Sequence, residues 1–520
     1  MKLTARLSFI ILCAVLAAIP VSAGDRGGSC GDVDALALRP VPGYLNVIGN
    51  EELGAGKLAV YPRIKKLVDG TYLMLCQGGK IASNIWAYRS EDLIHWTGCG
   101  NVFEAYPVTT EMGEDTRCFS TADAAVLPDG DVLAVVSFRA SKGYKYNIGC
   151  GLMTRRSSDG GRTWGPSQVI YEGTNWEPYL LVLPDGRIHC YFTDCLPAER
   201  NSGTSVLVSE DGGHNWSASR KVCRQYKYTL DSGARIYTDQ MPSFRVLKDG
   251  RTILGFLEAR LEPGGPGDKS VYKMSLVRNV GLDWQPLAED GTGPVDRETN
   301  LFNGCAGYVS VFPSGEVLLS CNIDMLFSMK LGDAEGRVFQ GPGWQDGWYR
   351  PFRGRGYWGS TEIVSPHLAV GAMHCDEGIQ TGLFYLNHPV SVSARSLSNL
   401  PVLDASDVFN YPDNVLFASN DPGTVSAFRF VRERRKFYAV ADIFAPEDVD
   451  TVNISVSLKT PDGIVEKNVD LVLDGGRGRI ELSVPLRSSV KEILFNAAVT
   501  SGGISGFVSD SPEGIRVSLD

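Results

Sequence analysis

The chain has 520 residues and a formal net charge of −10, and 58 of its residues are glycine. A chain of this length is expected to divide into two or more domains. Its acidic balance argues against a nucleic-acid or anionic-membrane partner, because both need a basic face. Frequent glycine with many aromatic residues and no long helical periodicity indicates an all-β chain rich in turns.

The first 23 residues have the pattern of an export signal. Lys2 and Arg6 give a positive start, Leu7–Ile19 is apolar, and Val21-Ser22-Ala23 supplies small residues for a signal peptidase. An apolar run of about 13 residues is shorter than a bilayer-spanning helix. We therefore expect cleavage near Ala23 and export to the periplasm, cell surface or exterior, with no membrane insertion. An uncleaved anchor is the alternative.

A hairpin pattern repeats through the first three-quarters of the chain. In each copy an apolar strand, an Asp-Gly or Ser-Gly turn and a second apolar strand follow one another. Copies spaced about 60 residues apart predict propeller blades, which bury their faces by stacking on their neighbours. The copies are Arg63–Leu75, Ala122–Phe138, Tyr179–Phe192, Pro242–Leu257 and Gly307–Cys321.

A propeller of this class needs one more blade than the repeats supply. We expect it between Gly356 and Pro389, with strands such as Ile363–Val370 and Gly382–Leu386. The N-terminal segment Ala35–Ile48 is expected to supply a closing strand. The prediction for residues 33–393 is a six-bladed β-propeller.

A second motif, S-x-D-x-G-x-x-W, recurs in register with the hairpins. Ser157–Trp164 and Ser209–Trp216 are complete copies, and Ser90–Trp96 is one residue short and lacks the glycine. The Asp can accept backbone N–H groups, the Gly takes a positive φ, and the Trp packs beneath the turn. The motif resembles the Asp-box of sialidases and related propellers, which lies between the outer strands of a blade and away from its centre.

From about Ala394 the chain changes character, and strand-like segments follow one another as in a β-sandwich. They are Ala427–Val431, Lys436–Ile443, Asn453–Leu458, Val469–Leu473 and Ile493–Val499. We predict a small β-sandwich over residues 394–520. The stretch Ala427–Asp442 resembles family 9 carbohydrate-binding modules. A plain structural cap is the alternative to a sugar-binding domain.

The cysteines do not have the spacing of a metal site. Cys76, Cys190 and Cys321 lie in apolar, strand-like runs, where a thiol behaves as a small hydrophobe. No CxxC pair or His/Cys cluster has zinc-ligand spacing. We expect few or no disulfides, no metal and no cofactor.

Two glutamates lie where the inner strands of neighbouring blades should meet the central funnel. Glu177 stands in Asn-Trp-Glu-Pro-Tyr, just before the third hairpin, and Glu258 follows the strand Thr252–Leu257, close to Arg260. Cleavage of a glycosidic bond needs two carboxyl groups about 5–10 Å apart. Glu177 and Glu258 are therefore the candidate catalytic pair. The alternative for each is a rim carboxylate paired with an arginine.

Arginine and aromatic side chains supply candidate substrate contacts. Arg63 begins the first inner strand, and the segment Trp344–Trp358 contains Arg355 and Trp358. Aromatic faces stack on sugar rings, and arginine binds hydroxyl or carboxylate groups. We interpret this segment as a substrate-contacting loop, with aromatic packing between blades as the alternative.

The order of these motifs resembles the exo-arabinanases of glycoside hydrolase family 93. The order is Asp123 before Leu-Pro-Asp-Gly, the first complete Asp-box, Trp-Glu-Pro, the second Asp-box, and a strand ending in Phe-Leu-Glu. The resemblance covers residues 57–390. It implies a six-bladed propeller that releases arabinobiose with retention, with Glu177 and Glu258 as nucleophile and acid/base in an order left open. The expected substrate contacts are Arg63, Asp123, Trp176, Arg260, Tyr308, Arg355 and Trp358.

An exo-α-sialidase and a non-catalytic glycan-binding propeller are the alternatives. Tyr61-Pro62-Arg63-Ile64 resembles the start of the sialidase arginine triad, which would make Glu258, Arg260 and Tyr308 a base, a second arginine and a nucleophile. The acid/base Asp of sialidases has no counterpart between Arg63 and Ser90, where Asp69 belongs to a turn, so Asp115 or Asp123 would have to replace it. In every reading the partner is an oligosaccharide or polysaccharide, and we expect a monomer.

Overall fold

The computed structural model describes residues 33–41, 43–54, 58–79, 82–195, 203–224, 235–262, 271–287, 296–404, 415–509 and 513–519. The export signal expected over residues 1–23 lies outside this part of the chain. No helix in the described part is long and apolar enough to cross a membrane. Besides strands it contains three short 3₁₀ helices, η1 (Val33–Ala35), η2 (Tyr144–Tyr146) and η3 (Leu397–Asn399).

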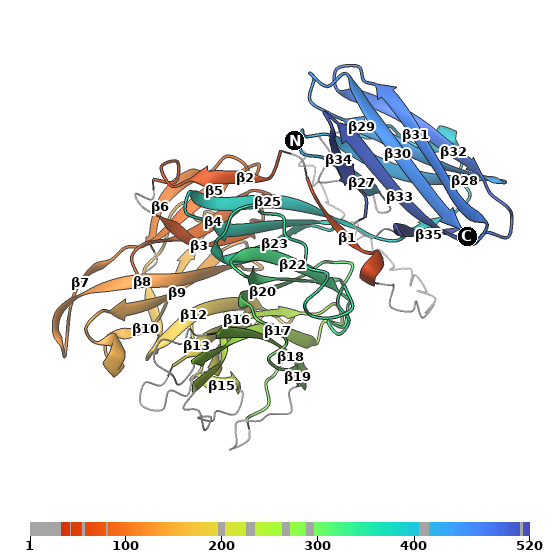
Figure 1. Ribbon diagram of the computed structural model, residues 1–520. Helices are drawn as coiled ribbons and strands as arrows, with labels where there is room; N and C mark the ends of the chain where they lie inside the picture. Colours follow the sequence, from red (N-terminus) through yellow and green to blue (C-terminus); the bar gives the residue numbers. More distant parts are fainter. Residues whose placement is uncertain are drawn as a thin grey trace, which may run out of the picture.

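Six antiparallel sheets follow one another along the chain and form the blades of a propeller (Figure 1). Blade 1 is β3 (Ala59–Lys66), β4 (Tyr72–Gly78), β5 (Ile85–Ser90) and β6 (Thr97–Phe103). Blade 2 is β7 (Tyr106–Thr110), β8 (Gly113–Val126), β9 (Val132–Ala140), β10 (Cys150–Ser157) and β11 (Gln168–Glu172). Blade 3 is β12 (Asn175–Val182), β13 (Ile188–Asp194), β14 (Gly203–Ser209) and β15 (Arg220–Cys223).

The remaining blades complete the ring. Blade 4 is β16 (Arg235–Val246), β17 (Thr252–Glu262), β18 (Val271–Val280) and β19 (Asp296–Glu298), and blade 5 is β20 (Cys305–Val311), β21 (Val317–Ile323) and β22 (Leu326–Gly332). Blade 6 is β23 (Tyr357–Ser365), β24 (Leu368–His374) and β25 (Gly378–Asn387), joined by β1 (Ala37–Pro40) and β2 (Asn46–Gly49). Both N-terminal strands pair with β25, so this segment closes the last blade as the sequence predicted.

The first long strand of each blade faces the propeller axis. Successive inner strands pack on one another, and the last packs on the first, so that the six close a ring. In blades 1 to 5 the predicted hairpins correspond to the inner strand and the strand that follows it. The inner strands are β3, β8, β12, β16, β20 and β23.

Every inner strand contains a β-bulge at the same place. At each one the pairing register shifts, and one non-glycine residue takes a positive φ. Such a backbone costs about 1–3 kcal/mol per residue and persists only where the surroundings impose it. We call the six residues the mouth ring; they are Tyr61, Thr121, Glu177, Met241, Ala306 and Trp358.

In blades 1, 3 and 4, a side chain on the strand after the inner strand accepts a hydrogen bond from the mouth-ring residue of the next blade. Gln77 Oε1 accepts the Thr121 N–H at 2.8 Å, Thr193 Oγ1 accepts the Met241 N–H at 2.8 Å, and Glu258 Oε2 accepts the Ala306 N–H at 2.7 Å. These acceptors occupy equivalent register positions, because each pairs with the residue one before its own blade's mouth-ring residue. We call them interblade latches. They satisfy backbone donors that burial would otherwise leave unpaired.

The motif segments form turns between the last two strands of blades 1 to 3, at the outer rim. In the second copy Gly161 N–H binds Ser157 Oγ at 2.8 Å, and Thr163 N–H binds Asp159 Oδ1 at 2.9 Å. Gly160 and Gly161 both have positive φ, which explains the glycines. The turns of blades 2 and 3 also accept a hydrogen bond from the preceding blade: Arg89 of blade 1 donates to the Gly160 carbonyl, and Arg156 of blade 2 donates to that of Gly212.

Two further sheets form a β-sandwich after the propeller (Figure 1). One contains β26 (Val390–Val392), β35 (Ile515–Leu519), β33 (Glu492–Ser501), β30 (Thr451–Thr460), β31 (Gly463–Val472) and β34 (Ile504–Phe507). The other contains β27 (Leu416–Ser419), β28 (Val425–Glu433), β29 (Lys436–Phe444) and β32 (Arg477–Pro485). The all-β fold with a six-bladed propeller and a following sandwich is thus confirmed. The division at residue 393 stays a prediction, and β26 already pairs with β35.

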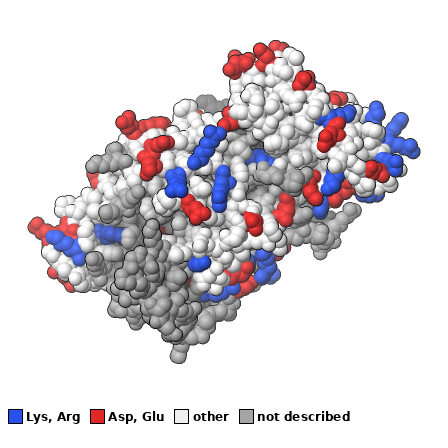
Figure 2. All heavy atoms as spheres, viewed as in Figure 1, with Lys and Arg blue, Asp and Glu red and all other residues white. Residues whose placement is uncertain are grey.

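The sandwich packs on the propeller through apolar residues. Val415, Phe417 and Ala427 belong to the same buried cluster as Val41 and Ile48 of the closing segment. On the face drawn in Figure 2, the described Lys and Arg side chains are interspersed with Asp and Glu.

The ten cysteines in the described part of the chain are free thiols. Cys76, Cys190 and Cys321 are buried within blade cores, where burial raises the pKa of each thiol. The described residues contain no cluster of His, Cys, Asp and Glu that would hold a metal ion.

Candidate active site

The structure brings Glu177 and Glu258 together at the mouth ring. Glu177 is itself the mouth-ring residue of β12, and Glu258 on β17 latches the ring residue Ala306. Glu258 is 7% exposed. Burial, and then the negative charge of Glu177, raise the pKa of Glu258 to about 8. Two neighbouring blades therefore place two coupled carboxyl groups at the same end of the inner strands.

Glu177 has partners that favour its charged form. Burial raises its pKa to about 7, but the Thr193 hydroxyl, which donates to Glu177 Oε2 at 2.8 Å, and the charges of Arg139 and Arg63 oppose this rise. Its backbone N–H donates to Thr121 Oγ1 at 3.2 Å, which fixes the strained bulge. Of the two carboxyl groups, Glu177 is thus the one that ionises first, and Glu258 keeps its proton to higher pH.

Arg139 lies beside Glu177 between two aromatic rings. Its guanidinium carbon is 3.6 Å from the centre of the Trp176 ring and 4.6 Å from that of Tyr144. Its Nη2 donates to Ser120 Oγ at 2.7 Å. Contacts of this kind hold the cation in place. Trp176 itself is partly exposed and remains available to contact a sugar.

Arg63 is enclosed by the mouth ring. Its guanidinium lies 3.8 Å from the centre of the Tyr61 ring, and its Nη1 donates to the carbonyls of Pro62 at 2.8 Å and Trp358 at 3.1 Å. The side chain is 3% exposed. Arg63 therefore acts on Glu177 through its charge. Its buried position differs from the direct contact with a substrate that we expected.

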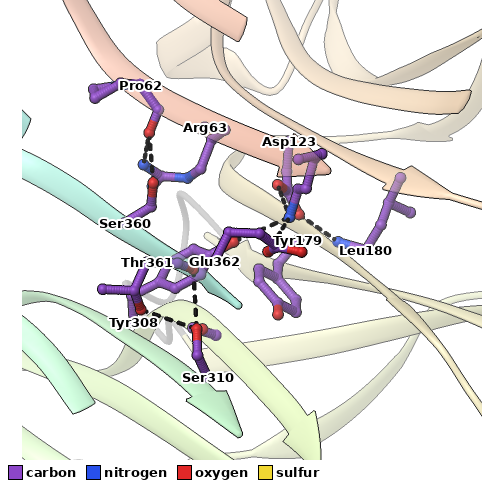
Figure 3. Close-up of polar contacts among 12 residues, drawn as sticks. Pro62, Arg63, Asp123, Tyr179, Leu180, Tyr308, Ser310, Ser360, Thr361 and Glu362 are labelled. Carbon is purple, nitrogen blue, oxygen red and sulfur yellow. Dashed lines mark hydrogen bonds and ion pairs between the residues drawn. The ribbon is translucent and has the colours of Figure 1, made fainter. Parts of the chain in front are cut away.

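A layer of paired charges lies further along the same strands, and part of it is shown in Figure 3. Lys65 Nζ is 3.1 Å from Asp123 Oδ1 and 3.2 Å from the Tyr308 hydroxyl, and Glu362 Oε2 is 3.2 Å from Arg245 Nη2. Burial opposes the charge on Lys65, but Asp123, Tyr308 and Glu362 together raise the pKa of Lys65 above its usual value. We call Lys65, Asp123, Arg245, Tyr308 and Glu362 the buried charge layer.

Asp123 and Tyr308, two of the expected substrate contacts, lie inside this layer. Asp123 is 1% exposed, and its second oxygen accepts the Leu180 N–H at 3.0 Å. Tyr308 is 2% exposed, with its hydroxyl bonded to Lys65. Both side chains are therefore held inside the propeller by contacts with neighbouring strands.

The other predicted residues divide between the ring and the surface. Arg260 lies near Glu258 and favours its charged form, and Trp358 stacks on His374 with ring centres 5.2 Å apart. Arg355 is exposed in the loop before β23, outside the described contacts of the two glutamates. Earlier in that loop, Trp344 and Trp348 pack against Phe302, as the aromatic-packing alternative predicted.

Sequence reasoning missed Thr193, Arg139 and Tyr272. Tyr272, on β18, lies near Glu258; burial, with the charge of Glu258, raises the pKa of Tyr272 to about 12. One signal was available, since the register of the Asp185-Gly186 hairpin, continued without a bulge, places Thr193 opposite Glu177; the bulge in β12 moves it opposite Trp176.

Comparisons with known proteins find partial similarities. No family model matches the chain. A sialidase from Micromonospora viridifaciens is 34% identical over 113 residues, which make up 18% of this chain and 17% of that protein. The chain thus matches only a small part of the length of this curated relative.

Several solved structures are similar over most of their length. They include a protein of unknown function from Dyadobacter fermentans (15% identity, TM-score 0.47, 67% of this chain and 99% of that chain). An α-L-arabinofuranosidase from Fusarium graminearum has 15% identity and a TM-score of 0.46, over 63% of this chain and 93% of that chain. An α-L-arabinanase from Penicillium chrysogenum in complex with arabinobiose has 16% identity and a TM-score of 0.44, over 67% and 98%.

Proposed function

We propose that this chain is an exported, retaining exo-glycosidase of the sialidase-like propeller class that acts on α-L-arabinofuranosyl chains. The observation that carries the proposal is the coupled pair Glu177 and Glu258, two carboxyl groups on adjacent blades, the first half-buried and the second buried, whose pKa values burial raises to about 7 and about 8. Pairs whose environments separate their ionisation are typical of acid–base and nucleophilic catalysis. The arabinofuranosyl specificity rests on the motif order in the sequence.

In the first step Glu177 is the nucleophile and Glu258 the general acid. Thr193 holds Glu177 Oε2, so Oε1 attacks the anomeric carbon and forms a covalent glycosyl ester. Glu258 Oε2 accepts the Ala306 N–H, so its proton resides on Oε1 and passes to the glycosidic oxygen as the bond to the leaving sugar breaks.

In the second step the roles of Glu258 reverse. The ionised Glu258 removes a proton from water, the water oxygen attacks the anomeric carbon, and the bond to Glu177 Oε1 breaks. Both carboxyl groups return to their starting states, and the product sugar keeps the anomeric configuration of the substrate. Trp176, the residue before Glu177, and Trp358, in the mouth ring of blade 6, are both partly exposed and supply aromatic surfaces for the sugar rings.

Exo-α-sialidase activity is the second candidate, favoured by the 34% identical segment of a sialidase. Three arginines, Arg63, Arg139 and Arg260, exert their charge on the glutamates and would suit an acidic sugar. The buried, Lys65-bonded hydroxyl of Tyr308 is poorly placed as a nucleophile. Neither replacement acid is free, because Asp123 is paired with Lys65 and Asp115 accepts the Lys142 N–H at 2.7 Å.

Product analysis separates the candidates. The purified protein, Glu177→Gln and Glu258→Gln are each incubated with linear arabinan, debranched arabinan and sialyllactose, and the products are identified by mass spectrometry. Arabinobiose release that both variants abolish is the expected result. Release of free sialic acid would transfer the assignment to the second candidate. Absence of product from all three glycans would overturn the arabinan proposal and favour another glycan or a non-catalytic glycan-binding propeller.

A further inference from the structure

Thr193 connects an interblade latch to one of the two glutamates. The side chain is 1% exposed, on β13 opposite Trp176, the residue before Glu177. Its Oγ1 accepts the Met241 N–H of blade 4 at 2.8 Å and donates to Glu177 Oε2 at 2.8 Å. The Gln77 latch also accepts a neighbouring N–H, but its amide nitrogen donates to the Gly79 carbonyl.

The latch decides which way the Thr193 hydroxyl points. A hydroxyl has one hydrogen to donate, and a backbone N–H can only donate. Because Met241 N–H occupies a lone pair of Oγ1, the Thr193 hydrogen is directed at Glu177 Oε2. A protonated Oε2 could not accept this hydrogen bond as well as a carboxylate does, so the contact favours the ionised form.

We propose that Thr193 is a positioning residue for Glu177, which holds Oε2 of the carboxylate and leaves Oε1 to react. A latch that only joined blades would need an acceptor alone, whereas Thr193 both accepts from blade 4 and donates to Glu177. The proposal rests on the proposed glycosidase function, since only a reacting carboxylate makes the choice of oxygen matter.

Other charged and titratable groups also act on Glu177, and they remain in place when Thr193 changes. The Met241 amide contributes to holding its charge. The side chains are Arg63 and Tyr61 on β3, Arg139 on β9, Tyr144 in η2, Cys195 after β13, Glu258 on β17 and Tyr272 on β18. A change confined to Thr193 therefore removes only the two hydrogen bonds of its hydroxyl, to Met241 and to Glu177, and the Thr204 control accounts for the loss of a bond between the same blades.

Thr193→Val removes the hydroxyl and keeps the shape, Thr193→Ser keeps the hydroxyl, and Thr204→Val is the matched control. Thr204 is buried, pairs in register with Thr193, and donates to the Asp239 carbonyl at 2.6 Å between the same two blades. A ¹³C NMR titration of glutamate carboxyl groups, with the Glu177 signal assigned by its loss in Glu177→Gln, measures the Glu177 midpoint without any substrate. If Thr193→Val does not fold, Thr193→Ala takes its place.

We expect Thr193→Val to raise the Glu177 midpoint by about one pH unit, the loss of one hydrogen bond to a charged group. Thr193→Ser and Thr204→Val should leave it near the wild-type value. The acidic limb of kcat/KM should shift with the midpoint, and kcat should fall more than KM changes. An unchanged midpoint in Thr193→Val, or an equal shift in Thr204→Val, would overturn the inference. A shifted midpoint in a protein that cleaves no glycan would contradict the proposed function and leave the Thr193–Glu177 contact standing.

Discussion

The mouth ring and the buried charge layer are built from the same inner strands, only four residues apart on β3 and on β23, yet they treat charge differently. In the buried layer Lys65 lies 3.1 Å from Asp123, and Arg245 lies 3.2 Å from Glu362. In the ring, no described Lys or Arg forms an ion pair with Glu177 or Glu258 at such distances. Paired charges stabilise the axis, whereas the unpaired glutamates have raised pKa values that are typical of functional sites.

Glu258 combines an interblade latch with a candidate role in catalysis. Glu258 occupies the register position that Gln77 and Thr193 occupy in other blades, and its Oε2 makes the same kind of bond to the next blade. Glu258 therefore has a structural contact through one oxygen and a candidate chemical role through the other. Replacement by glutamine keeps an oxygen for the Ala306 N–H, which makes Glu258→Gln a better test than alanine.

The largest difference between the layers should appear in activity. Glu177→Gln and Glu258→Gln are each expected to lower kcat on the cleaved glycan by at least about 10³-fold, because a nucleophile or a proton donor is lost. Initial rates of reducing-sugar release measure this effect. A variant that retains more than a tenth of the wild-type rate would remove its glutamate from the catalytic pair.

A substitution in the buried charge layer should mainly lower the stability of the fold. Lys65→Met leaves the buried Asp123 without its cation and the partly exposed Glu362 without one of its two, and we expect a loss of about 3–5 kcal/mol in the free energy of unfolding. Urea unfolding followed by tryptophan fluorescence measures the loss. The matched control is Lys66→Met at the next, exposed position, which should cost far less. Equal losses in the two variants would contradict the role of the charge layer.

The pH dependence of stability distinguishes Glu258 from the paired charges. The folded pKa of Glu258 is about 8 against an ordinary 4.5, so the folded state binds the proton more tightly than the unfolded state. Stability should therefore fall as the pH rises from about 4.5 through 8. Glu258→Gln removes this loss, and at pH 9 it should be more stable than the wild type, on the order of 2–4 kcal/mol. Urea unfolding at pH 5 and pH 9 provides the comparison. A variant that is equally or less stable than the wild type at pH 9 would show that Glu258 is not buried as a neutral acid.

A substitution at the outer rim should have the smallest effect on stability and activity. Arg156 joins blade 2 to the Gly212 carbonyl and lies 2.9 Å from Asp131, but it is partly exposed. Arg156→Met is expected to cost about 1 kcal/mol of stability and to leave activity unchanged, because screened, exposed pairs contribute little. Thermal unfolding together with the rate assay checks both parts. A loss as large as that of Lys65→Met would mean that the rim turns stabilise the ring as much as its centre does.

The blades could be predicted from the sequence because their signals are local. A turn dipeptide between apolar runs reveals a hairpin wherever the blade stands, and Gly160 and Gly161 mark a turn that needs positive φ. The closing strands could be placed because a repeat that lacks one blade must be completed from elsewhere. The two glutamates could be found because they follow from these hairpins and from the family resemblance.

The surroundings of the glutamates could not be predicted because they depend on contacts between blades. Nothing in the residue types of Tyr61, Glu177 or Trp358 signals a positive φ, since the register of the ring imposes it. Lysine is usually found at the surface. Lys65 is buried here beside Asp123, an ion-pair partner that comes from the next blade. Thr193 and Arg139 act through partners far away in sequence, and Asp123 and Tyr308 could not be recognised as structural without them.

The most direct test of the central claim is to identify the residue that becomes bound to the sugar. The wild-type protein is incubated with a slowly hydrolysed fluorinated arabinofuranoside, digested, and analysed by peptide mass spectrometry. The account predicts a glycosyl adduct on Glu177, absent from Glu177→Gln and formed more slowly in Glu258→Gln. An adduct on Glu258 or Tyr308, or turnover that inverts the anomeric configuration without any adduct, would contradict it.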